Sequence, residues 1–173
     1  MTNAARLLHR LKERSPVLLP GVCDAFGGMM AERAGFEAAY LSGASLSHSL
    51  LGRPDIGLTD ANDVVSAAQR ICDRISTPLV VDADTGYGGV LNVEQTVRRF
   101  ASAGVAGVQL EDQEFPKRCG HLAGKTLVST GEMVAKLRAA LAARGPNGPL
   151  IIARTDAIAV EGLEAACERA ENY

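Results

Sequence analysis

Five short apolar runs alternate along the chain with segments of helical periodicity. The runs occupy 17–22, 38–41, 79–81, 107–110 and 150–153. Each run is apolar nearly throughout, which is typical of strands buried on both faces of a parallel sheet. Strands that alternate with helices in this way predict an α/β fold. On length alone, a five-stranded flavodoxin-like sheet is the simpler interpretation, since a (β/α)8 barrel typically takes about 250 residues.

The segments between these runs read as helices. One is expected at about 3–14, another ends before Pro78, and Asn92 and Ser129 are the predicted N-caps of two more. The predicted apolar stripes are Val64, Ala68, Ile71 and Ile75; Met133, Leu137 and Leu141; and Leu163, Ala166, Cys167 and Ala170. The last helix, 162–173, has no C-cap glycine or closing proline. Because this pattern is that of a chain stopping inside an element, we expect a single, truncated barrel domain over 1–173, of TIM-barrel type with about the first five βα units.

Composition narrows the class of protein. The net charge is −2, no basic run is present, aromatic residues make up 4% of the chain and tryptophan is absent, which argues against binding to nucleic acid or to an anionic membrane. No segment approaches the length of a membrane span. The four cysteines are widely spaced, without zinc-ligand spacing, and Cys23 and Cys72 are predicted core residues. This usage predicts a reduced, cytoplasmic protein.

Polar residues follow four successive runs. They are 42–45 after the second run, Asp82 and Asp84 after the third, Glu111 and Asp112 after the fourth, and 154–156 after the fifth. In parallel α/β folds, active sites form at the carboxyl ends of the strands. Four polar strand ends in succession therefore predict a functional site there.

The acidic residues among these suggest a metal. Asp82 and Asp84 are two residues apart and would face the same way in extended backbone. With Glu111 they would form a site of hard oxygen ligands that suits Mg²⁺ or Mn²⁺. The alternative is that these carboxylates only cap the loop and helix that follow.

A pentapeptide, Lys117-Arg118-Cys119-Gly120-His121, adds a candidate reactive thiol. Cationic neighbours stabilise the thiolate, so we expect a lowered thiol pKa; an ordinary solvated basic loop is an equal alternative. A carboxylate substrate has two candidate partners. One is the set of backbone N–H groups of Ser42-Gly43-Ala44, for which the alternative is a simple turn between strand and loop. The other is the guanidinium of Arg154, which would bind a carboxylate bidentately; the alternative is an ordinary ion pair.

Taken together, these motifs resemble the isocitrate lyase / phosphoenolpyruvate mutase superfamily, and most closely its 2-methylisocitrate lyase and 2,3-dimethylmalate lyase branch. The stretches that carry the resemblance are 40–43, 52–55, 81–88, 111–113, 117–121 and 153–157. The resemblance implies a (β/α)8 barrel, usually tetrameric, with Mg²⁺ on Asp82 and Asp84 and with Asp55 and Glu111 in its water shell. It also implies a mobile loop around 117–121, and substrate contacts from Ser42, Gly43, Ala44, Cys119, Gly120 and Arg154.

The activity implied by the resemblance is Mg²⁺-dependent carbon–carbon cleavage of a 2-hydroxy di- or tricarboxylate to a 2-oxo acid. Cys119 would be the general acid, and Lys117, Arg118 and His121 would tune it. An oxaloacetate decarboxylase or hydrolase and a phosphonate or carboxyphosphonoenolpyruvate mutase are alternatives on the same scaffold. Because superfamily members run to nearly three hundred residues, an inactive fragment is a further alternative.

Overall fold

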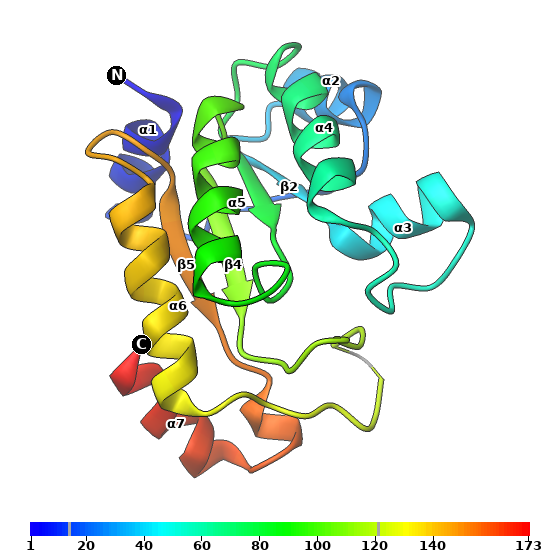
Figure 1. Cartoon of the computed structure of the whole chain (residues 1–173). Coiled ribbons are helices and arrows are strands. Elements are labelled where there is room, and N and C mark those ends of the chain that lie inside the picture. Colours follow the sequence, from blue (N-terminus) through cyan, green and yellow to red (C-terminus); the bar gives the residue numbers. More distant parts are fainter. Residues whose placement is uncertain (14, 121) are drawn as a thin grey trace.

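A computed structural model describes residues 1–13, 15–120 and 122–173 of the chain. Its centre is a parallel sheet whose strands follow one another in chain order (Figure 1). The strands are β1 (Gly21–Val22), β2 (Ala39–Leu41), β3 (Leu79–Asp82), β4 (Gly107–Glu111) and β5 (Leu150–Arg154). A flavodoxin-like sheet would have the order 2-1-3-4-5. The consecutive order is instead that of a barrel wall, so the partial-barrel prediction is confirmed and the flavodoxin-like alternative is wrong.

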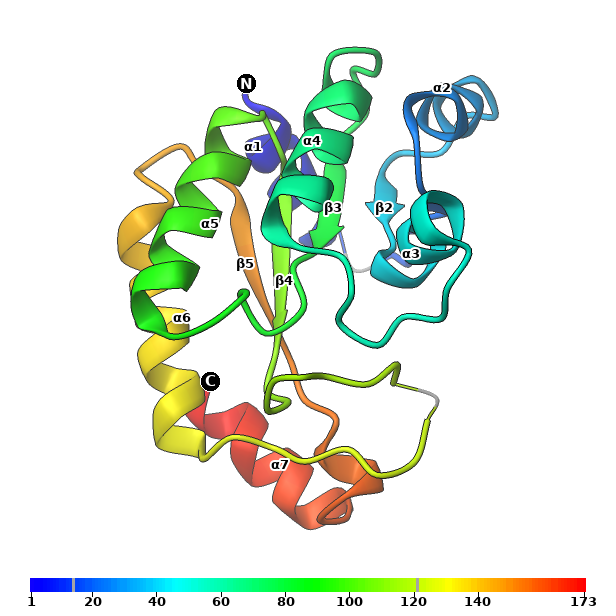
Figure 2. The same ribbon diagram turned by 45° about the vertical axis from the view of Figure 1, so that its right-hand side comes forward.

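Helices flank the sheet, and most of them lie on one of its faces. They are α1 (Asn3–Leu11), α2 (Ala25–Arg33), α3 (Gly43–Leu51), α4 (Ala61–Cys72), α5 (Val90–Ser102), α6 (Thr130–Ala143) and α7 (Leu163–Asn172), with a short 3-10 turn at Ala157–Ala159. Helix α2 packs against α4, α4 against α5 and α5 against α6 (Figure 2). Between these helices and the strands lies the main core, in which Leu41, Val81 and Phe100 are fully buried.

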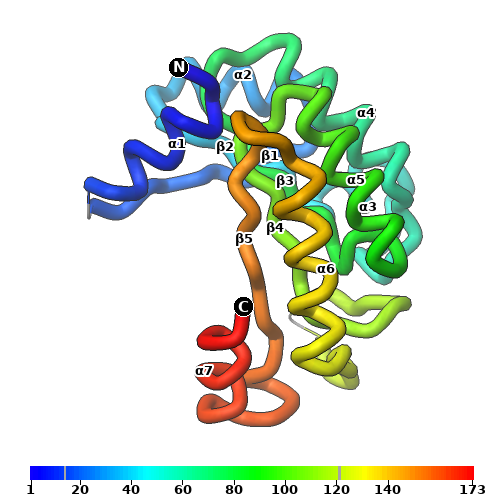
Figure 3. The backbone as a smooth tube through the Cα atoms, turned by 60° about the vertical axis from the view of Figure 1, so that its left-hand side comes forward, coloured from blue at the N-terminus to red at the C-terminus, as the bar shows by residue number. Residues whose placement is uncertain are grey.

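Helix α1 covers the amino-terminal end of the opposite face of the sheet. There Leu7 of α1 joins Ala38, Val80 and Ala106 in a small second core. Strand β5 lies at the outer edge of the sheet (Figure 3). Its side chains are half-buried or exposed rather than buried as expected, because β4 is the only strand that pairs with it among the described residues.

Three element boundaries differ from the sequence prediction. The first run pairs only at Gly21–Val22, because Pro20 has no N–H to donate and Leu18 is 71% exposed. Helix α1 ends at Leu11 rather than near 14, a position outside the described residues. Helix α5 begins at Val90 after Gly89, so Asn92 lies inside its first turn and is not the N-cap.

Two predicted apolar stripes are only partly buried. In α6, which Ser129 caps as predicted, Met133 and Leu137 are buried but Leu141 is 52% exposed. In α7 only Ala166 of the four predicted positions is buried. The predicted core residues Cys23 and Cys72 are half-buried, and all four cysteines are free. Within the described ranges, no helix is both long and apolar enough to cross a membrane.

Candidate active site at the carboxyl ends of the strands

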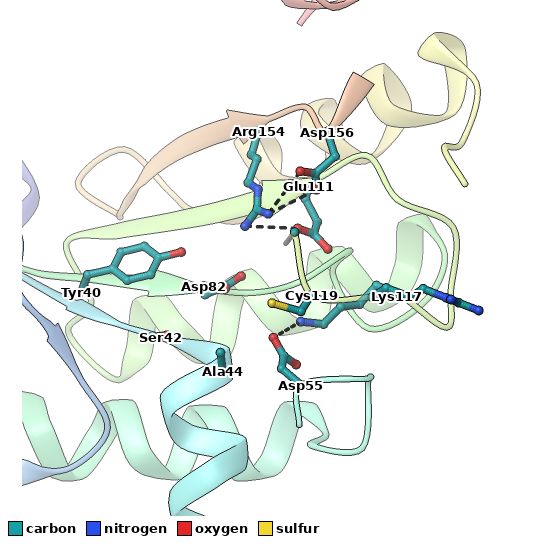
Figure 4. Close-up of a pocket in the computed structure, with 12 residues that line it drawn as sticks. Tyr40, Ser42, Ala44, Asp55, Asp82, Glu111, Lys117, Cys119, Arg154 and Asp156 are labelled. Carbon is teal, nitrogen blue, oxygen red and sulfur yellow. Dashed lines mark hydrogen bonds and ion pairs between the residues drawn. The ribbon is translucent and has the colours of Figure 1, made fainter. Parts of the chain in front are cut away.

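A cavity of about 340 Å³ opens at the carboxyl ends of the strands (Figure 4). It brings together nine of the predicted site residues with Tyr40, Arg118 and Asp156. Those nine are Ser42, Ala44, Asp55, Asp82, Glu111, Lys117, Cys119, Gly120 and Arg154. The predicted convergence of polar strand ends is therefore what the sheet produces, since parallel strands present their carboxyl ends at one edge.

The aspartate pair is held together by a turn rather than by extended backbone. Asp82 is the last residue of β3, while Asp84 has a left-handed φ of 48° and its amide donates to Asp82 Oδ1 at 3.1 Å. Both carboxylates lie against Gly43. A Cβ atom there would be 3.3 Å from Asp82 Oδ2 and 3.6 Å from Asp84 Oδ1. The small residue thus leaves room for two acids next to the first turn of α3.

Lys117 occupies the middle of the acidic cluster. Its Nζ lies 2.6 Å from Asp55 Oδ2 and 2.7 Å from Asp84 Oδ1, and the residue is 4% exposed. The ammonium group is therefore the counter-charge of two proposed metal-binding acids, rather than a neighbour of the thiol alone. With Lys117 there, no three acidic, histidine or cysteine side chains converge as direct ligands of one metal ion among the described residues.

Unpartnered polar atoms around this cluster fit a hydrated cation. Asp55 Oδ1, Glu111 Oε1, Thr85 Oγ1 and Tyr87 OH are buried without a hydrogen-bond partner in the part of the chain that the structure describes. Buried polar groups are normally satisfied, so such atoms point to a missing ion or water. The donor set is also one of hard oxygens, as Mg²⁺ prefers, with waters bridging to the more distant groups.

Two of the buried carboxylates have raised pKa values, because the nearby cations do not fully offset the effect of burial. Burial raises the pKa of Glu111 to about 8, with Arg154 opposing the shift and Asp82 adding to it. Burial likewise raises the pKa of Asp84 to about 6, with Lys117 opposing and Asp82 adding. Acids that are kept partly uncharged in a cleft are typical of functional sites. A divalent cation would supply the charge that these residues lack.

Arg154, at the end of β5, spans two acids. Its Nη1 lies 3.3 Å from Glu111 Oε2 and its Nη2 lies 3.2 Å from Asp156 Oδ2. Burial opposes its charge, but Glu111 and Asp156 outweigh that effect and raise the pKa of Arg154. Because the side chain is 30% exposed toward the cavity, its guanidinium both forms the predicted ion pair and remains accessible to a substrate carboxylate.

Helix α3 directs its amino terminus at the same cavity. Ser42 is its N-cap and accepts a hydrogen bond from the Ser45 amide at 3.3 Å. The amides of Gly43 and Ala44 precede that bond in the first turn, where N–H groups have no partner within the helix. A helix amino terminus favours an anionic group, so 42–44 suits a carboxylate.

Cys119 lies on the segment 113–128, which leaves β4 and leads into α6. Its sulfur faces the cavity near Lys117 (Figure 4). Arg118 is exposed and donates to the carbonyl of Ala123, so neither flanking cation makes the thiol its main partner. Gly120 packs on Arg154, where a Cβ atom would lie 2.5 Å from Nη2. His121, the remaining residue of the pentapeptide, lies outside the described residues.

Three residues near the cavity belong to motif stretches noted in the sequence, but no individual role was predicted for them. Tyr40 of β2 accepts a hydrogen bond from Gln109 through its hydroxyl at 2.9 Å and lines the cavity. Asp156 pairs with Arg154, and Gln113 is fully buried between Asp156 and Arg118. A polar ring inside an apolar strand was a usable signal for Tyr40. The polar run 154–156 was one for Asp156.

Comparison with known proteins fits this geometry. The family model described as phosphoenolpyruvate phosphomutase matches residues 8–173. The chain is 47% identical over 175 residues to 2-methylisocitrate lyase of Shewanella oneidensis, which covers all of this chain and 60% of that protein. A crystal structure of 2,3-dimethylmalate lyase, a PEP mutase/isocitrate lyase superfamily member, superimposes with a TM-score of 0.94 at 40% identity. The superposition covers 99% of this chain and 58% of the dimethylmalate lyase chain.

A second similar structure contains a metal. Phosphonopyruvate hydrolase in complex with oxalate and Mg²⁺ has a TM-score of 0.91 at 31% identity, covering all of this chain and 59% of that one. The chain therefore belongs to the phosphoenolpyruvate phosphomutase family, within the PEP mutase/isocitrate lyase superfamily, as its motifs predicted. It spans about 60% of the length of these relatives.

Proposed function

We propose that this chain carries the metal- and substrate-binding part of a Mg²⁺-dependent carbon–carbon lyase. Its substrate would be a 2-hydroxy di- or tricarboxylate resembling 2-methylisocitrate or 2,3-dimethylmalate, and its product a 2-oxo acid such as pyruvate together with a carboxylate. The observation that carries this proposal is one cavity lined by a thiol, a guanidinium and an acidic cluster. The relatives named 2-methylisocitrate lyase and 2,3-dimethylmalate lyase support it.

Asp82 and Asp84 are the proposed metal ligands, with Asp55 and Glu111 acting through water. Mg²⁺ bound there would hold the hydroxy and carboxylate oxygens of the substrate and stabilise the negative charge that develops on them. Asp55 and Glu111 each have a buried oxygen without a hydrogen-bond partner among the described residues, which supports this assignment. Mn²⁺ has the same preference for oxygen ligands and is expected to substitute.

The remaining residues would bind and orient the substrate. Arg154 and the amides at 42–44 reach the cavity from two different strand ends, so they can hold two carboxylates at once. Two such binding groups suit a substrate with at least two carboxylates. Lys117, which already neutralises two acids, and His121, whose position is outside the described residues, are expected to offset the remaining negative charge.

Cys119 is the proposed general acid. A base removes the proton of the substrate's 2-hydroxyl group, and the carbonyl of the 2-oxo acid forms as the bond between the two carbons breaks. The electron pair of that bond stays on the departing fragment as a carboxylate-stabilised carbanion. The Cys119 thiol then gives its proton to that carbon, which leaves a thiolate facing the cationic side of the cavity. The sulfur's position at the cavity wall supports this role.

A substrate panel tests the proposal. The protein is incubated with methylisocitrate, dimethylmalate, oxaloacetate or phosphonopyruvate, with and without Mg²⁺, and the 2-oxo acid released is measured. The proposal predicts Mg²⁺-dependent release from one of the first two compounds. Release only from oxaloacetate would identify a decarboxylase or hydrolase, release only from phosphonopyruvate would identify C–P chemistry, and no release from any compound would favour an inactive fragment.

Location and assembly follow from the same proposal. A reduced set of four free cysteines and a small carboxylate substrate suit a cytoplasmic enzyme. A homo-oligomer, and specifically a tetramer, is proposed by analogy with the superfamily. Sedimentation of the purified protein tests this point directly.

A further inference from the structure

The segment that bears Cys119 is fastened to the end of β5 mainly through one side chain, that of Asp156. This carboxylate is 12% exposed and has partners both on the cysteine segment and at the end of β5. Gln113 Nε2 donates to Asp156 Oδ2 at 2.9 Å, and Lys125 Nζ lies 3.6 Å from Oδ1. Arg154 Nη2 lies 3.2 Å from Oδ2. Asp156 thus joins both flanks of the cysteine segment to the guanidinium proposed to bind substrate.

The two partners from the cysteine segment bracket Cys119 closely. Gln113 accepts from the Arg118 amide at 3.0 Å and donates to the Arg118 carbonyl at 2.9 Å, which fixes the backbone directly before the cysteine. Lys125 donates to the Gly120 carbonyl, directly after it. Both side chains are buried, and both end at Asp156. The backbone of Cys119 is therefore held from either side by groups that meet at a single carboxylate.

Asp156 is itself placed by a deeper network. Its amide donates to Asp112 Oδ1 at 3.1 Å, and Asp112 is fully buried. Asp112 Oδ2 also accepts from Thr155 Oγ1 at 2.7 Å and from the Tyr173 hydroxyl at 2.8 Å. Arg169 of α7 completes this network at 3.4 Å. Helix α7 thus fixes the backbone of Asp156, so the side chain presents a rigid anion to the cysteine segment.

We propose that Asp156 is a positioning residue that holds the Cys119 segment over the cavity, in register with Arg154. Removing its charge leaves the buried Lys125 ammonium without its counter-ion and weakens the charge-assisted contacts that tie the cysteine segment to the end of β5. The segment then separates from Arg154 while the sheet and helices remain intact. This inference goes beyond the proposed reaction, and it holds or fails whatever substrate the cavity takes.

Thiol labelling tests the proposal without substrate or metal. Asp156→Asn keeps the shape of the side chain and removes its charge. Glu114→Gln is the matched control, because Glu114 is exposed on the same segment and has no side-chain bond within the described residues. Each protein is alkylated with iodoacetamide, and the rate at each cysteine is measured by peptide mass spectrometry. Labelling of exposed Cys167 controls for the activity of the reagent, and labelling of half-buried Cys72 shows whether the core stays folded.

The proposal predicts that Asp156→Asn raises the labelling rate of Cys119 by about tenfold or more while Cys72 and Cys167 keep their wild-type rates. Glu114→Gln should leave all three rates unchanged. An unchanged Cys119 rate in Asp156→Asn, or a rise that Cys72 shares, would overturn the proposal. If Asp156→Asn does not fold, Lys125→Met decides by the same criterion, since it removes the other charge of the pair.

Discussion

Replacing Lys117 by methionine removes the cation at the centre of the acidic cluster while keeping a side chain of similar length. The ammonium lies 2.6 Å from Asp55 Oδ2 and 2.7 Å from Asp84 Oδ1, and Lys117 is 4% exposed. The gross attraction of each contact is on the order of 6 kcal/mol at an effective dielectric constant of about 20. Burial of the charges offsets much of it, and removal of one partner from a buried pair typically costs about 3–5 kcal/mol.

For a chain of this size, a loss of about 3–5 kcal/mol corresponds to a melting temperature lower by roughly 6–20 °C. The assay is thermal unfolding of the metal-free protein at pH 8, where Asp84, with its pKa of about 6, is ionised. Lys12→Met is the control, because Lys12 is exposed and its side chain has no partner among the described residues. A Lys117→Met protein whose unfolding free energy stays within about 1 kcal/mol of wild type would refute this account of the cluster.

The same variant reports on the proposed metal. A ligand that binds only the folded state stabilises it by about 2.7 kcal/mol at a hundred times its Kd. In the wild type a cation at Asp84 competes with the Lys117 ammonium, whereas in Lys117→Met it does not. Mg²⁺ should therefore raise the melting temperature of Lys117→Met more than that of the wild type. Equal shifts in the two proteins would contradict competition at this site.

Three further predictions concern separate parts of the molecule. Gly120→Ala places a Cβ 2.5 Å from Arg154 Nη2, so it should displace the guanidinium and weaken Mg²⁺-dependent oxalate binding about tenfold, measured by calorimetry. Arg169→Met leaves buried Asp112 without its cation and should cost about 3 kcal/mol in urea unfolding. Glu32, whose pKa is lowered chiefly by a backbone hydrogen bond, should contribute stability above its unfolded pKa of 4.5 and lose it as the pH falls further. The difference in stability between wild type and Glu32→Gln should therefore shrink below about pH 4.5.

Each of these has an outcome that contradicts it. Unchanged oxalate binding in Gly120→Ala would mean that Arg154 does not contact the ligand. Arg138→Met, on the exposed side of α6, is the matched control for Arg169→Met, and equal effects of the two would refute the buried network. For Glu32→Gln, a difference from wild type that grows as the pH falls would reverse the assigned sign of the linkage.

Much of the fold was predictable because the buried strands leave a strong local signal. The apolar runs at 79–81 and 107–110 became β3 and β4 nearly residue for residue. The first run did not. Strand pairing at 17–20 requires backbone N–H donors and an adjacent strand, which hydrophobicity does not reveal, and Pro20 has no N–H. The stripe of α7 also misled. Its Arg169 is buried in a polar network with Asp112, which periodicity cannot reveal.

The candidate site was predictable in its composition but not in its pairing. That acids and a cysteine segment meet at the strand ends follows from the topology of parallel strands. That Lys117 lies between Asp55 and Asp84, 62 and 33 residues away in the chain, depends on how the segment after β4 folds back over the sheet. The same fold-back makes Asp156 a partner of Gln113 and Lys125. Neither contact has a signature in local sequence.

The proposed function rests on Cys119 delivering a proton to a substrate held by a metal and by Arg154. The most direct measurement compares Cys119→Ser with the wild type in two assays, 2-oxo acid release from the preferred substrate and Mg²⁺-dependent oxalate binding. We expect the rate of 2-oxo acid release to fall by about a hundredfold or more, while the oxalate Kd stays within about threefold. Undiminished release from Cys119→Ser would contradict the assignment of the general acid.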